Sequence, residues 1–296
     1  YRTKGLRRVN PFTAMAMLCN MPAHHLSLRY QCQAYNSTVV TACASGAQAI
    51  GEAAEAIRRG AADLMLAGGV EAMIHPVLVG AFVVMRVLAS DNDCPEKAIK
   101  PFDARRDGFV CAEGSAVMVL ERLDHALARG ARIYAEVLGY AANTDAYHVA
   151  IPDPEGAGAV RCMRWALEDA GVEPSEIDYI NAHGPGTEVG DPAETRAIKT
   201  LFGEHAYKVP ISSTKSMVGH ALGGAGAIEA MACVKSIETG IIHPTINYEV
   251  PDPECDLDYV PNVARKADVR TTLSNSFGLG GQNACLVLHK LEEQVA

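Results

Sequence analysis

The sequence has few aromatic residues and no excess of positive charge. Phe, Tyr and Trp together make up 6% of the 296 residues, with a single Trp, which disfavours a binding surface built from aromatic side chains. The 35 acidic residues outnumber the 26 basic ones and give a formal charge of −9. A general nucleic-acid binder is therefore not expected, because phosphate contacts require a basic surface.

Long apolar runs and paired cysteines are also lacking. No run of about 18 or more apolar residues occurs, so we expect no membrane-spanning helix. The nine cysteines include no C-x-x-C pair, which argues against a zinc site and against a disulfide framework. Free thiols in a chain of this length favour a reducing compartment, namely the cytoplasm or an organelle stroma or matrix.

The sequence does contain alternating strand and helix patterns. Hydrophobic residues make up 49% of the chain and charged residues 21%, which suits a large core. Periodicity predicts strands at 37–41, 63–69, 115–120, 133–140, 177–182 and 209–212, with the third paired to the fourth. It predicts helices at 44–59, 121–130, 156–170 and 192–202. This order favours an α/β fold with mainly parallel, buried strands.

One short internal similarity suggests a duplicated unit. The segments GAQAI at 46–50 and GAGAI at 224–228 each follow a strand and a turn, and each opens a helical pattern. Those patterns end at Gly60 and Gly240. A chance match is the alternative, because helices that start with Gly and Ala are common.

Cys43 lies between a predicted strand and a predicted helix, in the motif T-A-C-A-S-G at 41–46. Backbone N–H groups at a helix start favour an anion, so we expect a lowered thiol pKa there. The same amides could bind a developing oxyanion on a thioester carbonyl. The alternative is a buried structural cysteine, which is the commoner role of a lone Cys.

Two histidines and a lysine follow strands in the second half of the chain. His183 lies in NAHGPGTEVGD at 181–191, and Lys215 and His220 lie in SSTKSMVGHALGGAGA at 212–227. Histidines on glycine-rich loops after strands suit proton transfer or hydrogen-bond donation. A third loop, NSFGLGGQN at 275–283, contains Phe277 and is also compatible with a tight hairpin of no catalytic role.

Taken together, these motifs resemble the β-ketoacyl-[acyl-carrier-protein] synthases, and most closely the type II enzymes of bacterial fatty-acid synthesis. PFDARRDGFV at 101–110, NTDAYH at 143–148 and HPTIN at 243–247 are similar to the same family. The resemblance implies a thiolase-like α/β fold with five αβαβα layers and two duplicated halves, at 1–130 and 131–296. It also implies a homodimer joined through the strand at 37–41. Because the sequence opens at Tyr1 without a methionine, we expect the first portion of the N-terminal half to be absent.

The resemblance further implies an acyltransferase that condenses an acyl thioester with malonyl-acyl carrier protein and releases CO2. Cys43 would be acylated, His183 and His220 would stabilise the enolate, and Lys215 would support them. The amides of Cys43 and Phe277 would bind the tetrahedral oxyanion, and Phe277 would gate the acyl pocket. No metal or organic cofactor is expected, because the carrier's phosphopantetheine delivers both substrates. The substrate-binding residues implied are Thr187, Gly278 and Arg86, the last as a docking site for the carrier protein.

Two positions depart from the family pattern. Pro185 replaces a threonine expected to bind pantetheine, and Leu279 replaces a phenylalanine, so arm binding and chain-length preference could differ. Three alternatives remain: a thiolase, a polyketide ketosynthase and a non-catalytic partner subunit. A thiolase normally has a second catalytic cysteine, and none of the later cysteines lies in such a motif. Polyketide ketosynthases usually carry D-T-A-C-S-S, and partner subunits lose the nucleophile that Cys43 represents.

Overall fold

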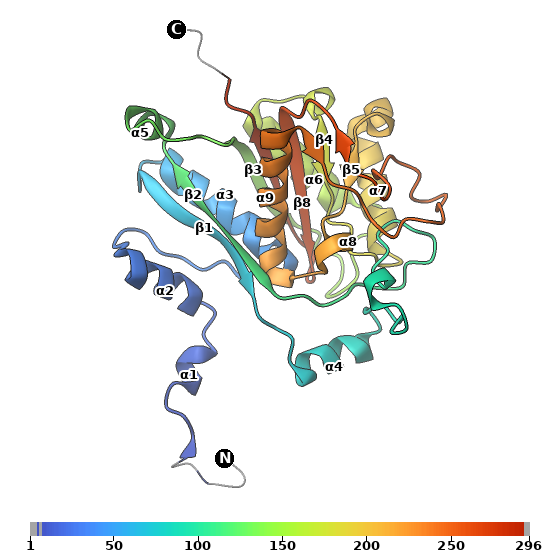
Figure 1. Cartoon of the computed structure of the whole chain (residues 1–296), viewed down its shortest axis with the longest axis horizontal. Coiled ribbons are helices and arrows are strands. Elements are labelled where there is room, and N and C mark those ends of the chain that lie inside the picture. Colours follow the sequence, from blue (N-terminus) through green and yellow to red (C-terminus); the bar gives the residue numbers. More distant parts are fainter. Residues whose placement is uncertain (1–4, 6–7, 293–296) are drawn as a thin grey trace.

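A computed structural model describes residues 5 and 8–292 of the chain (Figure 1). The expectation about the start of the chain, at Tyr1, lies outside these residues. Two β-layers and two helical layers alternate through the body of the molecule. The main sheet has five strands in the order β3-β9-β8-β4-β5: β3 (Glu136–Thr144), β9 (Gln282–His289), β8 (Thr271–Gly278), β4 (Tyr179–Asn181) and β5 (Ile211–Ser212).

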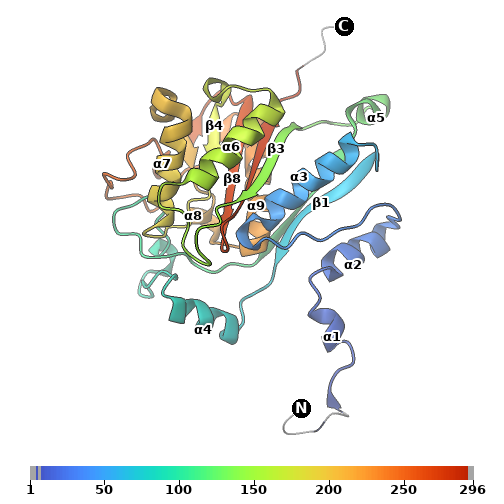
Figure 2. The ribbon, with the colours of Figure 1, turned by 180° about the vertical axis from the view of Figure 1, so that it is seen from behind.

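Helices cover both faces of this sheet. On one face lie α6 (Ala157–Ala170) and α7 (Gly190–Phe202) (Figure 2). On the other face lie α3 (Ser45–Arg58) and α9 (Leu222–Thr239), which also pack against a two-stranded ribbon of β1 (Leu64–Glu71) and β2 (Gly114–Glu121). The order of layers is therefore ribbon, helices, sheet, helices. The far side of the ribbon bears exposed side chains, including Val117 and Val119.

Shorter elements connect and flank these layers. The helices α1 (Thr13–Ala16), α2 (Met21–Tyr30) and α4 (Pro76–Met85) lie away from the core (Figure 1). The remaining helices and strands are α5 (Leu123–Ala128), α8 (Lys215–Val218), β6 (Ile241–Ile242) and β7 (Arg265–Lys266). Single helical turns are η2 (Ala42–Ala44), η3 (Pro95–Lys97), η4 (Pro174–Glu176) and η5 (Gly203–Tyr207). No helix among the described residues is both long and apolar enough to cross a membrane.

The helices α3 and α9 cross at small residues, and the contact is reciprocal. A Cβ added to Gly46 would lie 2.7 Å from the amide nitrogen of Ala227, and one added to Gly226 would lie 2.7 Å from that of Ala47. Both glycines therefore allow the two helix backbones to touch. The reciprocal contact relates Gly46 to Gly226 and Ala47 to Ala227, a register two residues further along than the match between GAQAI and GAGAI.

Most predicted elements are confirmed, and three expectations are wrong. The expected helices correspond to α3, α5, α6 and α7, and the expected strands at 63–69, 177–182 and 209–212 to β1, β4 and β5. In the single chain the segment at 37–41 forms no strand, because no other described strand lies beside it to share hydrogen bonds; its pairing with a second copy stays a prediction. The segments at 115–120 and 133–140 do not pair: β2 pairs with β1, and β3 with β9. The strand pairs within residues 8–292 are mainly antiparallel, since only β4–β5 and β4–β8 among them are parallel.

Candidate active site

Cys43 lies in the turn η2, directly before α3, and only 4% of its surface is exposed. Its Sγ is 3.2 Å from Nε2 of His220. Burial raises the pKa of the Cys43 thiol to about 11, while the charge of Lys215 and the amide of Leu279 act in the opposite direction. The expected lowering of the thiol pKa is therefore wrong, because loss of solvation outweighs the local dipoles.

His183 follows β4, and its backbone is fixed from α7. The carboxylate of Glu194 accepts hydrogen bonds from the amides of His183 and Gly184, at 2.9 and 2.8 Å. Asn275 of β8 donates to the same carboxylate from 3.2 Å. Burial raises the pKa of Glu194 to about 7, although these three donors favour its ionised form. Glu194 thus sets the turn that presents the imidazole of His183.

Lys215 begins α8 and is almost fully buried beside His183. Its Nζ donates to the carbonyl of His183 at 2.5 Å and contacts Nδ1 of the same residue at 3.3 Å. It also forms a buried ion pair with Glu229 of α9. An ammonium group has no lone pair, so Nδ1 of His183 must accept and the ring proton must sit on Nε2. Sequence reasoning did not single out Glu229, although an isolated acid in an apolar helix was a usable signal.

His220 lies in the turn between α8 and α9 and is fixed by its own backbone. Its amide donates to Val110 at 2.7 Å, and its carbonyl accepts from Ala112 at 3.0 Å. The rings of His220 and His183 are 5.4 Å apart at 80°. Burial, followed by the charge of Lys215, lowers the pKa of both histidines well below the usual 6.5. Both rings are therefore neutral near pH 7.

The hairpin of β8 and β9 closes the site from the other side. The ring of Phe277 lies 5.9 Å from that of His183. A side chain at Gly278 is excluded, since a Cβ there would lie 2.8 Å from the carbonyl of Thr41 and 3.2 Å from the amide nitrogen of Cys43. The backbone amides of Leu279 and of Cys43 itself both act to lower the pKa of the Cys43 thiol. The expectation that the amide of Phe277 binds the oxyanion stays a prediction, and Leu279, two positions along the chain, is a second candidate for this role.

A cavity of about 430 Å³ opens onto these groups. Of the expected site residues, the cavity is lined by Cys43, His183, His220, Phe277, Gly278, Thr187 and Arg86, and Lys215 lies behind His183. Pro185 and Leu279, the two departures from the family pattern, also line it. Arg86 ends α4 in a left-handed conformation, with φ of 58°, and its side chain is exposed.

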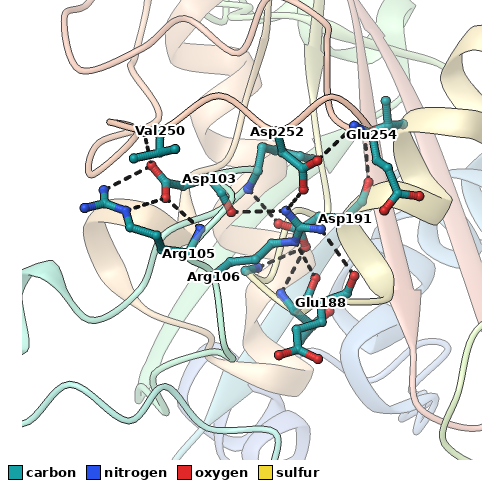
Figure 3. Close-up of polar contacts among 12 residues, drawn as sticks. Asp103, Arg105, Arg106, Glu188, Asp191, Val250, Asp252 and Glu254 are labelled. Carbon is teal, nitrogen blue, oxygen red and sulfur yellow. Dashed lines mark hydrogen bonds and ion pairs between the residues drawn. The ribbon is translucent and has the colours of Figure 1, made fainter.

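Two charged residues hold the loop that carries Pro185 and Thr187 (Figure 3). Arg106 donates to the carbonyls of Thr187 and Glu188, at 3.0 and 3.3 Å, and pairs with Asp252 at 2.5 Å. Asp191 accepts from the amides of Phe102, Gly186 and Thr187, at 2.7 to 3.2 Å. The wall of the cavity is therefore held through both its carbonyl and its amide groups.

One set of side chains could hold a metal ion. The donor atoms of Cys43, His183 and His220 all lie within 4.8 Å of one another, and all three residues are buried. Such a set can alternatively form a covalent acyl intermediate at sulfur and donate two ring N–H groups beside it. The arrangement thus combines one nucleophile with two neutral hydrogen-bond donors and a buried cation.

Comparisons with known proteins all identify the same family of enzymes. Residues 1–126 match the β-ketoacyl synthase N-terminal domain, and residues 134–249 match the β-ketoacyl synthase C-terminal domain. The 3-oxoacyl-[acyl-carrier-protein] synthase 2 of Coxiella burnetii is 49% identical over 98% of this chain and 70% of its own length. The enzyme of the same name from Staphylococcus aureus strain COL is 47% identical over the same shares.

Solved structures give the same result. A type II polyketide ketosynthase in complex with its acyl-carrier protein superposes with a TM-score of 0.95 at 40% identity, covering 97% of this chain and 71% of the other. A β-ketoacyl synthase from Burkholderia phymatum gives 0.92 at 39% identity, with coverage of 98% and 70%.

Proposed function

Because this chain belongs to the β-ketoacyl synthase family, we propose that it is an acyltransferase, a 3-oxoacyl-[acyl-carrier-protein] synthase of fatty-acid chain elongation. It condenses an acyl thioester with malonyl-acyl carrier protein through an acyl-cysteine intermediate. The observation that carries the proposal is the 3.2 Å contact between Sγ of Cys43 and Nε2 of His220, with His183 and Lys215 beside it.

The first half-reaction transfers the acyl group to Cys43. Its sulfur attacks the thioester carbonyl, the carrier's pantetheine thiol leaves, and the Cys43 proton passes to that thiol. Nε2–H of neutral His220 donates to the sulfur as the S–H bond breaks and so stabilises the developing thiolate. The amides of Cys43 and of either Phe277 or Leu279 bind the oxyanion of the tetrahedral intermediate.

The second half-reaction forms the carbon–carbon bond. Malonyl-carrier protein loses CO2, and the electron pair of the broken bond passes to an enolate. The enolate oxygen accepts hydrogen bonds from Nε2–H of His183 and of His220, both neutral at pH 7. The enolate carbon attacks the acyl carbonyl, the bond to sulfur breaks, and Cys43 leaves as a thiolate that takes up a proton from solvent. Lys215 holds the His183 tautomer that this role requires.

The carrier protein and a second copy of the chain are the proposed partners, and the cytoplasm or an organelle stroma or matrix the proposed compartment. Thr187 and Gly278 line the cavity that the pantetheine arm would enter. The exposed Arg86 would contact the carrier protein at the mouth of this cavity. The arm delivers both substrates, so no metal or organic cofactor takes part.

We further propose that the chain consists of two halves, at 1–130 and 131–296. Gly130, with φ of 66°, follows α5 and precedes β3 in support of this division.

Intact mass tests the acyl-enzyme directly. After incubation with an acyl-carrier protein, the chain should gain one acyl mass, and Cys43→Ala should gain none. His220→Ala should still be acylated but should decarboxylate malonyl-carrier protein much more slowly. A wild-type chain that gains no adduct would instead favour a non-catalytic carrier-binding subunit. A monomeric mass in solution would contradict the homodimer.

A further inference from the structure

We propose that Cys43, His183 and His220 together bind one thiophilic divalent cation, Zn²⁺ above all, whenever Cys43 is not acylated, and that the bound ion reversibly blocks the site. This inhibitory site goes beyond the proposed function. The donor set is one thiol sulfur and two imidazole nitrogens, the ligand types that Zn²⁺ prefers. Three protein ligands leave a fourth coordination position for water, and the cavity has room for that water molecule.

The geometry is close to that of a tetrahedral ion. Zn–S and Zn–N bond lengths require donor atoms about 3.3 to 3.6 Å apart. Sγ of Cys43 and Nε2 of His220 are already 3.2 Å apart, and all three donors lie within 4.8 Å. Shifts of these side chains by roughly 1 Å would bring the three donor atoms to that spacing.

Charge near the site does not exclude a cation. The ammonium of Lys215 is paired with the carboxylate of Glu229, so the pair has no net charge. Lys215 makes three contacts, and the 3.3 Å contact with Nδ1 of His183 is the longest. Binding through Nε2 of His183 moves the ring proton to Nδ1, so this contact is lost and the Lys215 ammonium has to turn away from the new N–H while it keeps its other two contacts. Nδ1 of His220 has no hydrogen-bond partner among the described residues, so the site is weaker than one built for a metal.

The binding step is balanced without any oxidant. The Cys43 S–H bond breaks, its proton goes to solvent, and a metal–sulfur bond forms while the ion sheds bound water. An acylated or alkylated Cys43 has no proton to lose and no thiolate to offer. The acyl-enzyme is therefore protected, and only the resting enzyme is blocked.

Titration with Co²⁺ alone tests this site, because Co²⁺ shows thiolate charge-transfer and tetrahedral ligand-field absorption whereas Zn²⁺ is silent. A variant lacking the exposed thiols, with Cys19→Ser, Cys32→Ser and Cys94→Ser combined, serves as the reference chain. It should bind one Co²⁺ with both absorptions, and Zn²⁺ should displace the ion. In the same background, Cys43→Ala should lose the thiolate band, and His220→Asn should weaken binding at least about tenfold.

Alkylation with iodoacetamide at alkaline pH, with modification of Cys43 verified by peptide mass mapping, provides a control in which no residue is substituted. The alkylated chain should show no thiolate band, and circular dichroism should report an unchanged fold. Absence of the band in the reference chain, or its persistence after Cys43→Ala or alkylation, would overturn the proposal. Because the absorption reports ligands and not turnover, failure of the proposed function would leave this test unaffected.

Discussion

Nζ of Lys215 lies 3.3 Å from Nδ1 of His183 and decides which nitrogen of that ring carries the proton. The lysine lies behind the histidine and does not line the cavity. It therefore acts on the reaction through His183, as a positioning residue, and its own charge is balanced by Glu229.

Replacing Lys215 by Met should slow malonyl decarboxylation by roughly 100-fold, because His183 loses the bond that keeps its proton on Nε2. Acyl transfer to Cys43 should fall much less. The single variant leaves Glu229 buried and unpaired, which costs about 3–5 kcal/mol of stability. The double variant Lys215→Met with Glu229→Gln should regain stability but not decarboxylation. CO2 release and thermal unfolding separate the two effects, and recovery of both would refute the positioning role.

The buried thiol of Cys43 should react slowly with iodoacetamide at neutral pH. Its pKa is raised to about 11, so the thiolate fraction, and with it the alkylation rate, should rise about tenfold per pH unit up to that value. Peptide mass mapping follows Cys43 against exposed Cys94 in the same sample. A Cys43 rate that levels off near pH 7 would show that the helix start lowers the thiol pKa after all.

Asp191 should make the protein less stable as the pH rises from about 4 to about 6. Burial raises its pKa from 3.8 to about 6, so the folded state binds the proton more tightly than the unfolded state. The stabilisation is complete below pH 4 and is lost through the folded pKa, about 3 kcal/mol in all. Denaturant unfolding of wild type and Asp191→Asn across this range measures the difference. Parallel stability curves for the two chains would contradict it.

Arg86→Glu should weaken binding to acyl carrier protein roughly tenfold and make it less salt-dependent. The side chain is exposed at the cavity mouth, where a cation can meet an acidic partner although the whole chain carries −9. Arg164→Glu, on the exposed surface of α6, is the matched control. Turnover of a small soluble thioester should survive. Equal losses with both substrates would indicate a pocket defect instead.

Leu279→Phe should shorten the longest acyl chain that the enzyme accepts. Leu279 lines the cavity beside Cys43, and a phenyl ring there occupies space that the leucine leaves open. Mass spectrometry of the carrier-bound products gives the length distribution, with Leu279→Met as a control of similar volume. An unchanged distribution would show that this position does not limit chain length.

The sequence predicted the elements whose signals are local, and missed groups that only packing creates. Glycine stops and apolar runs located α3, α6 and β1 well. The segment at 37–41 has β-rich residues, but a strand also needs a neighbour, and no sequence pattern supplies one. Glu194 has the pattern of an ordinary helical acid until the fold buries it, whereas Glu229 was overlooked although it stands alone in an apolar stretch of α9. The amide of Leu279 had no signal at all, because every residue carries one.

The crossing of α3 and α9 sets the distance between the nucleophile and one of its histidine partners. Cys43 lies just before α3, and His220 lies just before α9, so the spacing of the two helix axes sets the distance from sulfur to imidazole. That spacing depends on Gly46 and Gly226, because glycine has no side chain to hold the two helices further apart. A single methyl group at either position would wedge the helices apart by about half an ångström or more. A displacement of that size is small compared with a typical loop motion. It is nevertheless enough to take Sγ of Cys43 out of hydrogen-bond contact with Nε2 of His220.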